Sequence, residues 1–127
     1  MRWSPFLGIP ILLAIISYIV FQLFPNSCTY FPPVRLFTVE YLAPYNGTDP
    51  GLPILLGILG SVFDVTKGRD HYGAGGGYNH FSGRDASRAF VSGNFTGEGL
   101  TDTLHGLSRA EVKSIVEWRD FYFRTYT

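Results

Sequence analysis

The chain has almost no cysteine and no excess of either charge. Cys28 is the only cysteine among its 127 residues, which excludes an intrachain disulfide framework and a multi-cysteine zinc site. Its 10 lysines and arginines balance 10 aspartates and glutamates, so the composition lacks the basic excess that is typical of proteins that bind a phosphate backbone. We therefore expect neither a disulfide framework nor a nucleic acid partner.

Several catalytic signatures are also missing. The glycines of residues 73–77 follow neither the G-x-x-x-x-G-K-[ST] order nor the G-x-G-x-x-G spacing of nucleotide-binding loops. His71, His80 and His105 lack the i, i+4 spacing of a zinc protease helix. No G-x-S-x-G elbow of a serine hydrolase is present. The sequence therefore favours a binding protein over an enzyme.

One long apolar run lies near the N-terminus. Residues 6–24 carry no charge, and their number is about what is needed to cross a hydrocarbon core of roughly 30 Å. We predict a short tail at residues 1–5, a transmembrane signal-anchor helix at 6–24 and a spacer at 25–34. A cleaved signal peptide, which would release a secreted form, is the alternative, with a weak cleavage site near Ser27.

The charges beside this run predict its orientation. Arg2 precedes the run and Arg35 is the first charge after it, so the positive-inside tendency places the N-terminus in the cytosol. Two N-x-[ST] sequons, at Asn46 and Asn94, agree with a lumenal or extracellular domain, where such sites are modified. We expect a single-pass protein of the endoplasmic reticulum or endomembrane system, held in membrane lipid by its N-terminal helix.

The domain is expected to begin at residue 35 and to run to residue 127. Its first elements are a predicted strand at residues 36–38 and a short helix at 39–42. Thr38 is the expected cap of that helix. Two apolar runs separated by a glycine then predict a β-hairpin at the centre of the sheet, with its turn at Gly60.

Glycine marks the stretch after the hairpin. Five glycines between residues 68 and 77 predict a loop whose backbone can approach a large ligand closely. After this glycine loop, Asp85 is the predicted cap of a helix, and Gly93 is its predicted end.

A capping box begins the last predicted helix, which is the best defined element. Ser108 and Glu111 have the S-x-x-E spacing in which the two residues cap each other. Apolar and aromatic side chains at helical spacing follow, among them Ile115, Trp118 and Tyr122, and supply one face of the helix.

Aromatic residues are abundant. They form 17% of the chain, with 8 tyrosines and 11 phenylalanines, which suits either a flat apolar ligand pocket or a small core built from large side chains. Tyr72 and Tyr78 lie in the glycine loop, and tyrosine is a recognised axial ligand of haem iron. The alternative is a glycine-rich surface turn with two incidental tyrosines.

Two segments carry a resemblance to a known family. The segment GSVFDVTKG at 60–68 and the segment FSGRDASR at 81–88 resemble the membrane-associated progesterone receptor family of cytochrome b5-like domains. The likeness is closest to the neuferricin-like branch and to plant membrane steroid-binding proteins, and it runs from about Leu36 to Tyr126. It implies a cytochrome b5-like α+β fold whose cleft binds haem b with tyrosine in place of paired histidines.

The resemblance also implies roles for three tyrosines. Tyr78 matches the axial ligand of the haem iron, and Tyr72 matches the tyrosine that hydrogen-bonds at the haem. Tyr126 matches the tyrosine of a Lys-Tyr pair at the cleft. Thr125 stands where the lysine of that pair is expected, and Arg124 is adjacent.

The function implied is that of a membrane-anchored, haem-binding adaptor that can respond to steroids. An anionic phenolate ligand favours ferric iron, so binding, sensing or transfer of haem fits better than electron transfer. The open haem face is expected to meet a haem enzyme or a second copy of the domain. The alternative is a haem-free module of the same fold that binds sterol or another protein.

Overall fold

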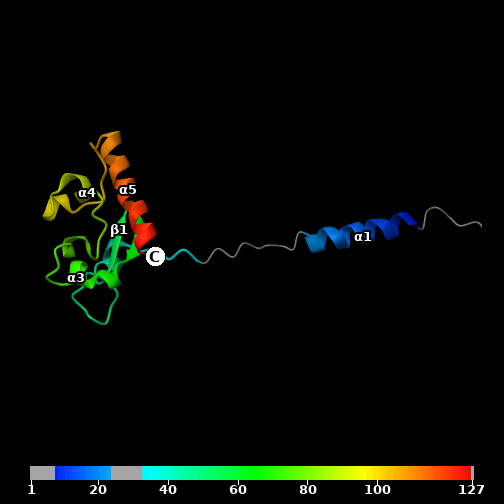
Figure 1. The fold of residues 1–127 in the computed structure, drawn as a ribbon, viewed down its shortest axis with the longest axis horizontal. Helices are drawn as coiled ribbons and strands as arrows, with labels where there is room; N and C mark the ends of the chain where they lie inside the picture. The colour runs from blue at the N-terminus through cyan, green and yellow to red at the C-terminus, as the bar shows by residue number, and fades with distance from the viewer. Residues whose placement is uncertain (1–7, 24–32, 127) are drawn as a thin grey trace, which may run out of the picture. The chain divides into compact units, whose positions relative to one another are not determined.

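The computed structural model describes residues 8–23 and 33–126, and the chain divides into two units, residues 1–35 and 36–127 (Figure 1). The first unit contains α1 (Gly8–Leu23), a helix of 16 residues without a charged side chain. Within the described ranges, none of the helices combines the length and the apolar character of a membrane span. The predicted span at residues 6–24 is longer than α1, and residues 6, 7 and 24 lie outside the described part, as do Cys28 and most of the predicted spacer.

The second unit is built on an antiparallel hairpin of β1 (Leu55–Ile58) and β2 (Ser61–Asp64). Leu59 and Gly60 form its two-residue turn with φ angles of 50° and 77°. Positive φ at both positions is the geometry that matches the right-handed twist of paired strands. The predicted hairpin is therefore confirmed, and in the described residues it forms the whole sheet.

The strand predicted at residues 36–38 is wrong. The free side of β1 is taken by residues 83–85, where Gly57 N–H donates to Arg84 O at 2.9 Å and Gly83 N–H donates to Leu55 O at 2.7 Å. That edge of β1 is therefore not open to another strand, and residues 36–38 have no regular secondary structure. Instead Thr38 caps α2 (Val39–Leu42), as predicted, by accepting a hydrogen bond from Tyr41 N–H at 3.1 Å.

The predicted glycine loop begins with helical turns. They are η1 (Thr66–Gly68), a 3-10 helix, and α3 (Arg69–Tyr72), and a second 3-10 helix, η2 (Asn79–Phe81), follows the glycines. Asp64 Oδ1 accepts from Thr66 N–H at 2.9 Å and so directs the chain from β2 into η1. Gly68 is the last residue of η1, whereas Gly73, Gly75, Gly76 and Gly77 lie outside helices and strands, as expected for a loop.

The helix predicted after Asp85 begins later than expected. It is α4 (Ala89–Ser92), and the two Asp85 oxygens have different partners: Gly60 N–H donates to Oδ2 at 2.9 Å, and Ser87 N–H donates to Oδ1 at 3.1 Å in a local turn before the helix. Gly93, with a φ of 66°, ends α4 as predicted, and a third 3-10 helix, η3 (Gly97–Gly99), follows.

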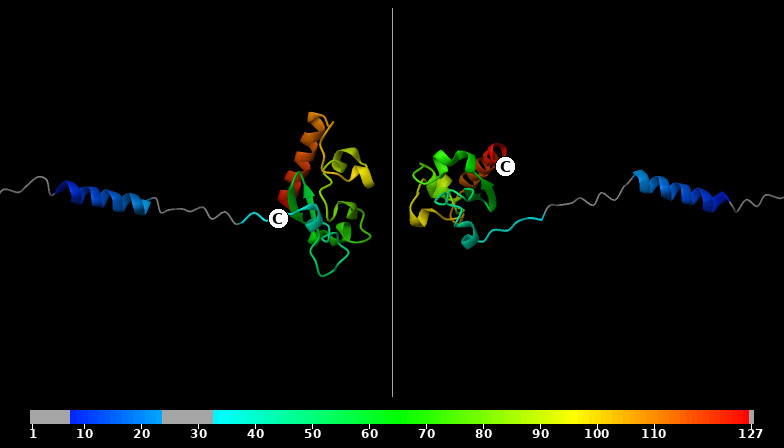
Figure 2. Two further views of the ribbon diagram at one scale, coloured as in Figure 1. Left: turned by 180° about the vertical axis from the view of Figure 1, so that it is seen from behind. Right: turned by 90° about the horizontal axis from the view of Figure 1, so that it is seen from below.

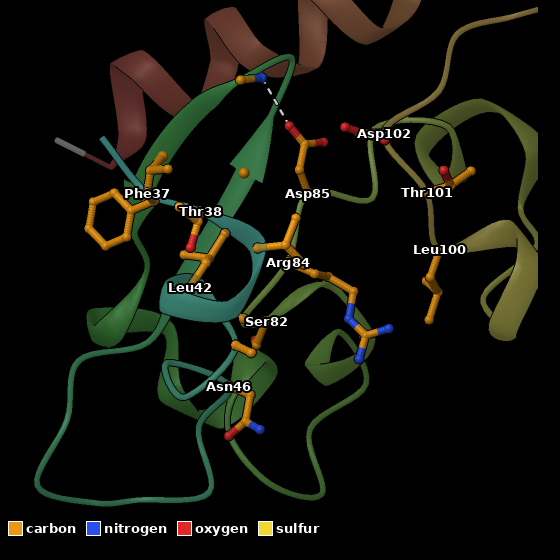
Figure 3. Close-up of a pocket in the computed structure, with 16 residues that line it drawn as sticks. Phe37, Thr38, Leu42, Asn46, Ser82, Arg84, Asp85, Leu100, Thr101 and Asp102 are labelled. Carbon is orange, nitrogen blue, oxygen red and sulfur yellow. Dashed lines mark hydrogen bonds between the residues drawn. The ribbon is translucent and has the colours of Figure 1, made fainter. Parts of the chain in front are cut away.

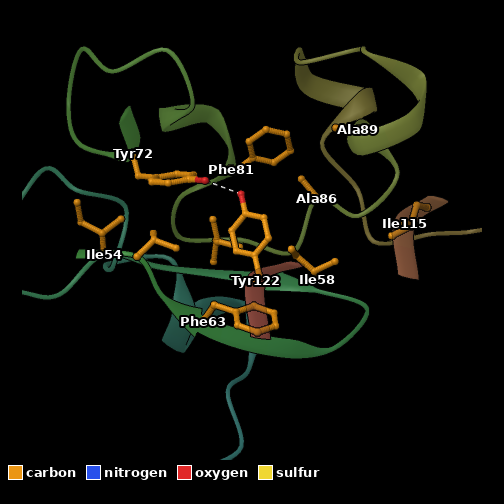
Figure 4. Close-up of a cluster of buried hydrophobic side chains, with 11 residues drawn as sticks. Ile54, Ile58, Phe63, Tyr72, Phe81, Ala86, Ala89, Ile115 and Tyr122 are labelled. Atoms are coloured by element: carbon orange, nitrogen blue, oxygen red, sulfur yellow. Dashed lines mark hydrogen bonds between the residues drawn. The ribbon is translucent and has the colours of Figure 1, made fainter. Parts of the chain in front are cut away.

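The last helix, α5 (Arg109–Thr125), has the predicted capping box. Ser108 Oγ accepts from Glu111 N–H at 3.2 Å, and Glu111 Oε2 accepts from Ser108 N–H at 2.7 Å. Figure 2 shows α5 lying beside the hairpin, and its residues contact both β2 and α4. Ile115 and Tyr122 are its buried residues, and they pack into a core with Ile54, Leu56, Ile58, Phe63, Val65, Tyr72 and Phe81 (Figure 4).

Candidate functional site

Two hollows of ligand size open in the second unit. The first, of about 550 Å³, lies between α2, the hairpin and residues 82–85 and 100–102 (Figure 3). It has one aromatic side chain, that of Phe37, and the Asp85 carboxylate at its wall already holds Gly60 N–H. The second has a volume of about 410 Å³ and is walled mostly by aromatic rings. Pockets for flat organic ligands are lined mainly by apolar and aromatic side chains, as this second hollow is.

The second hollow is named the tyrosine cleft here, because four tyrosines line it. Tyr72 is the last residue of α3, Tyr78 precedes η2, and Tyr122 and Tyr126 come from the end of α5. The ring centroid of Tyr72 lies 5.8 Å from that of Tyr78 and 6.0 Å from that of Tyr126. The three tyrosines selected from the sequence therefore meet at one cleft.

Other aromatic rings complete the walls. Phe81 and Phe90 stack with their centroids 4.5 Å apart, and Trp118 lies 5.7 Å from Phe90. Phe95 and Phe121 also line the cleft, and both are exposed, as Trp118 is. Exposed aromatic rings gathered around a hollow are typical of a ligand or partner site.

Burial divides the tyrosines into two kinds. Tyr78 is 52% exposed, whereas Tyr72 and Tyr122 are 5% and 3% exposed. The hydroxyls of Tyr72 and Tyr122 lie 2.5 Å apart in a hydrogen bond, and Figure 4 shows them pointing toward each other. Burial is the main cause that raises the pKa of both phenols, so both stay protonated at neutral pH. Among residues 33–126, no hydrogen bond occupies the Tyr78 hydroxyl.

Two histidines lie near the cleft. The ring of His71 is 5.8 Å from Tyr78, and that of His80 stacks on Phe95 at 4.3 Å. Burial lowers the pKa of His80, followed by the charge of Arg84. In the part of the chain that the structure describes, no three His, Cys, Asp or Glu side chains are grouped as a metal site would require.

A lysine lies near the end of the cleft although Thr125 replaces the expected one. The Lys67 ammonium donates a hydrogen bond to the backbone oxygen of Thr125. The same ammonium is 4.9 Å from the centroid of the Tyr126 ring, which lines the cleft. The end of the cleft near Thr125 therefore has a cation, which Lys67 of η1 supplies. Arg124 is exposed on the last turn of α5.

Tyr122 is the site residue that the sequence reasoning missed. The helical spacing predicts only that it lies on the apolar face of the last helix, which it does occupy. Its hydroxyl nevertheless lies against the cleft. The available signal was its spacing, because Tyr122 and Tyr126 are four residues apart and share one helix face.

Comparisons with known proteins agree with this geometry. The family model described as "Cytochrome b5-like Heme/Steroid binding domain" matches residues 38–113. Membrane-associated progesterone-binding protein 4 of Arabidopsis thaliana is 66% identical over 98% of this chain and 50% of its own length. Neuferricin of Danio rerio is 48% identical over 75% of this chain and 36% of its own length. The chain thus spans half or less of these two relatives.

A solved structure supports the fold. It is that of an Arabidopsis thaliana protein described as having a cytochrome b5-like fold, and it superimposes with a TM-score of 0.67 at 40% identity. The match covers 74% of this chain and 86% of that one. The VFDV and FSGRDASR segments, the α+β architecture and these relatives lead to one assignment. The chain belongs to the membrane-associated progesterone receptor family of cytochrome b5-like haem/steroid-binding domains.

Proposed function

We propose that the chain is a haem-binding adaptor in which Tyr78 is the axial ligand of haem b iron. The main support for this proposal is the exposure and the hydrogen bonding of the Tyr78 phenol. It is half-exposed at the tyrosine cleft, and no hydrogen bond within residues 33–126 occupies its hydroxyl. Tyr72 and Tyr122, by contrast, are buried and bound to each other. Tyr78 therefore has the oxygen that is ready to bind a metal.

The surroundings of Tyr78 fit a haem. Gly75 and Gly77 precede it, and a Cβ at either position would meet nothing within 4 Å, so the backbone beside the ligand is open. The rings of Phe81 and Phe90 offer an apolar wall to a macrocycle. When bound, the haem would supply ferric iron that an anionic phenolate stabilises over ferrous iron, which suits binding better than electron transfer.

The adaptor role is supported by the mouth of the cleft. Tyr78, Phe95, Trp118 and Phe121 are all exposed there, so a partner can cover them without displacing the core. A haem enzyme or a second copy of the domain is the partner we propose for this face. Aromatic residues are enriched where proteins meet.

The proposed ligand is tested by titrating the purified chain with haemin. The wild type should show a saturable Soret shift of the ferric high-spin type, and Tyr78→Phe should abolish this spectrum. Tyr45→Phe is the matched control, because Tyr45 packs against Phe37 and Tyr41 and does not line the cleft. If the wild type gives no Soret shift, the proposal is wrong.

We further propose that α1, extended by its neighbouring residues, anchors the domain on the lumenal or outer side of a membrane. Its support is an apolar helix without charge and a relative named as membrane-associated. Alkaline extraction of membranes tests the anchor and should leave the chain in the pellet. Glycosidase treatment then tests the topology by detecting glycans on the domain. Asn94 is exposed and should carry a glycan in that topology. A chain released by alkali would contradict the anchor.

A haem-free sterol-binding module is the second candidate. Its support is the neutral character of the cleft, where two protonated tyrosine hydroxyls lie among apolar rings, together with Thr125 in the place of a lysine. The name of the Arabidopsis relative also refers to progesterone binding. Saturable sterol binding that Tyr78→Phe leaves unchanged would favour this candidate over haem.

A further inference from the structure

We infer that Tyr122 is a positioning residue. It orients the hydroxyl of Tyr72 so that Tyr72 donates its hydrogen to the protein oxygen atom that would bind the haem iron. This inference rests on the proposed function, under which that atom is the phenolate oxygen of Tyr78. Tyr122 itself would touch neither the iron nor the iron-bound oxygen. It would act through its hydrogen bond to Tyr72.

The hydroxyls of Tyr72 and Tyr122 carry more hydrogens than the bond between them uses. A tyrosine hydroxyl has one hydrogen to donate and can also accept. Tyr72 and Tyr122 together have two hydrogens, and the bond between them uses one. Both side chains are almost fully buried, so water has little access to the second hydrogen. A buried donor without an acceptor is costly, and an acceptor in the cleft would remove that cost.

Tyr126 does not change this count. Its ring lies 6.0 Å from that of Tyr72 and 5.3 Å from that of Tyr122, close enough for its hydroxyl to join the chain. A third hydroxyl would add one bond and one hydrogen. One hydrogen would still be left for an acceptor outside the chain.

The identity of the acceptor follows from the neighbours. Tyr72 lies against Tyr78, with ring centroids 5.8 Å apart. Besides Tyr126, whose neutral hydroxyl belongs to the chain already counted, the other rings around Tyr122 are those of Phe63, Phe90 and Phe121, which cannot accept a conventional hydrogen bond. An iron-bound phenolate is the strongest acceptor in this set, because hydrogen bonds to charged oxygens are roughly twice as strong as neutral ones.

This arrangement sets the direction of both bonds. Tyr72 would donate to Tyr78, and its oxygen would then be free to accept from Tyr122. The Tyr122 hydroxyl polarises that of Tyr72, because hydrogen bonds in a chain strengthen one another. The stronger bond would withdraw charge from the phenolate and so weaken its preference for ferric iron.

The test is the reduction potential of the haemin-loaded full chain carrying Tyr122→Phe, which keeps the buried ring. Haemin should still bind at the same stoichiometry. The variant should favour the ferric over the ferrous state about threefold to tenfold more than the wild type does. A tenfold change corresponds to a reduction potential lower by about 59 mV. The ferric charge-transfer band should shift as well. Tyr45→Phe, outside the cleft, should change neither.

The double variant separates positioning from packing. Tyr72→Phe should lower the potential at least as much as Tyr122→Phe, and adding Tyr122→Phe to it should cause no further change. A Tyr122→Phe protein with the wild-type potential overturns the inference and leaves the proposed function intact. The inference is also overturned if adding Tyr122→Phe to Tyr72→Phe lowers the potential further by as much as Tyr122→Phe does alone. A wild type without a haemin spectrum overturns the proposed function and this inference together.

Discussion

Gly83 and Gly93 have nearly the same backbone conformation in different surroundings. Their φ angles are 74° and 66°, which L side chains rarely adopt. A Cβ on Gly83 would lie 2.8 Å from the backbone oxygen of Ala43 and 2.8 Å from the Cβ of Asn46, whereas one on Gly93 would meet nothing within 4 Å. The two positions therefore separate conformational strain from steric contact.

We predict that Gly83→Ala destabilises the domain more than Gly93→Ala. The left-handed conformation should cost each variant about 1–2 kcal/mol of unfolding free energy. Overpacking should add about 1–3 kcal/mol at Gly83 alone. Urea denaturation of both variants measures the difference. Equal losses would show that residues 43–46 can move aside.

Lys67 allows a test of the charge at the end of the cleft. We expect Lys67→Gln to weaken haemin binding about twofold to fivefold, the range of an exposed ion pair, because the ammonium beside Tyr126 can attract a propionate. Lys113→Gln is the control, because Lys113 is exposed on α5 and pairs with Glu117 at 3.8 Å. Haemin titrations of both variants, at low and at high salt, should show weaker binding for Lys67→Gln only. The same affinity in both variants would argue against this role.

At the scale of the element, the start of α5 should respond to acid. Hydrogen bonds from the backbone and side chain of Ser108 lower the pKa of Glu111 below its ordinary value of 4.5. Because the pKa is lower in the folded chain, the stabilisation is complete above 4.5 and is lost as the pH falls through the folded value.

We therefore predict that Glu111→Gln is less stable than the wild type at neutral pH and that the gap narrows in acid. Urea denaturation at about pH 6 and about pH 3 measures this gap. Glu117→Gln is the control, since Glu117 lies beyond the first turn of the same helix. A gap that stays constant across this range would mean that the capping box makes no ionic contribution.

Elements defined by local signals could be predicted from the sequence. The capping box at Ser108, the hairpin turn at Gly60 and the cap at Thr38 each depend on residues within a few positions. The two failures are long-range. Asp85 binds the backbone of Gly60 and makes only a local turn at Ser87 where a helix start was expected, and residues 83–85 pair with β1, whereas the strand expected at residues 36–38 does not form.

The same division applies to the site. Tyr72, Tyr78 and Tyr126 were selected through family resemblance, and the structure brings all three to one cleft. Tyr122 was missed because a helix-face pattern does not say whether a tyrosine hydroxyl meets a partner. Its partner, Tyr72, is 50 residues away in the sequence. Only the three-dimensional structure, in which the two hydroxyls meet, reveals the pair.

For the molecule as a whole, the core belongs to one unit. Every buried residue of the hydrophobic cluster lies between Ile54 and Tyr122, within residues 36–127. We predict that a fragment of residues 36–127 folds and binds haemin as the full chain does. Circular dichroism and a haemin titration of both measure this. A fragment with a lower melting temperature and weaker haemin binding would show that residues 1–35 contribute to the fold.

The loop that carries Tyr78 is held by its own hydrogen bonds. Tyr78 N–H donates to His71 O at 2.8 Å, and the backbone oxygen of Tyr72 accepts from Asn79 Nδ2 at 2.9 Å and from Ser82 Oγ at 2.7 Å. A loop ordered in this way has little conformational entropy left to lose when a ligand arrives. Capture of haemin should therefore follow a single kinetic phase whose rate rises linearly with haemin concentration, because encounter and not loop ordering would limit it.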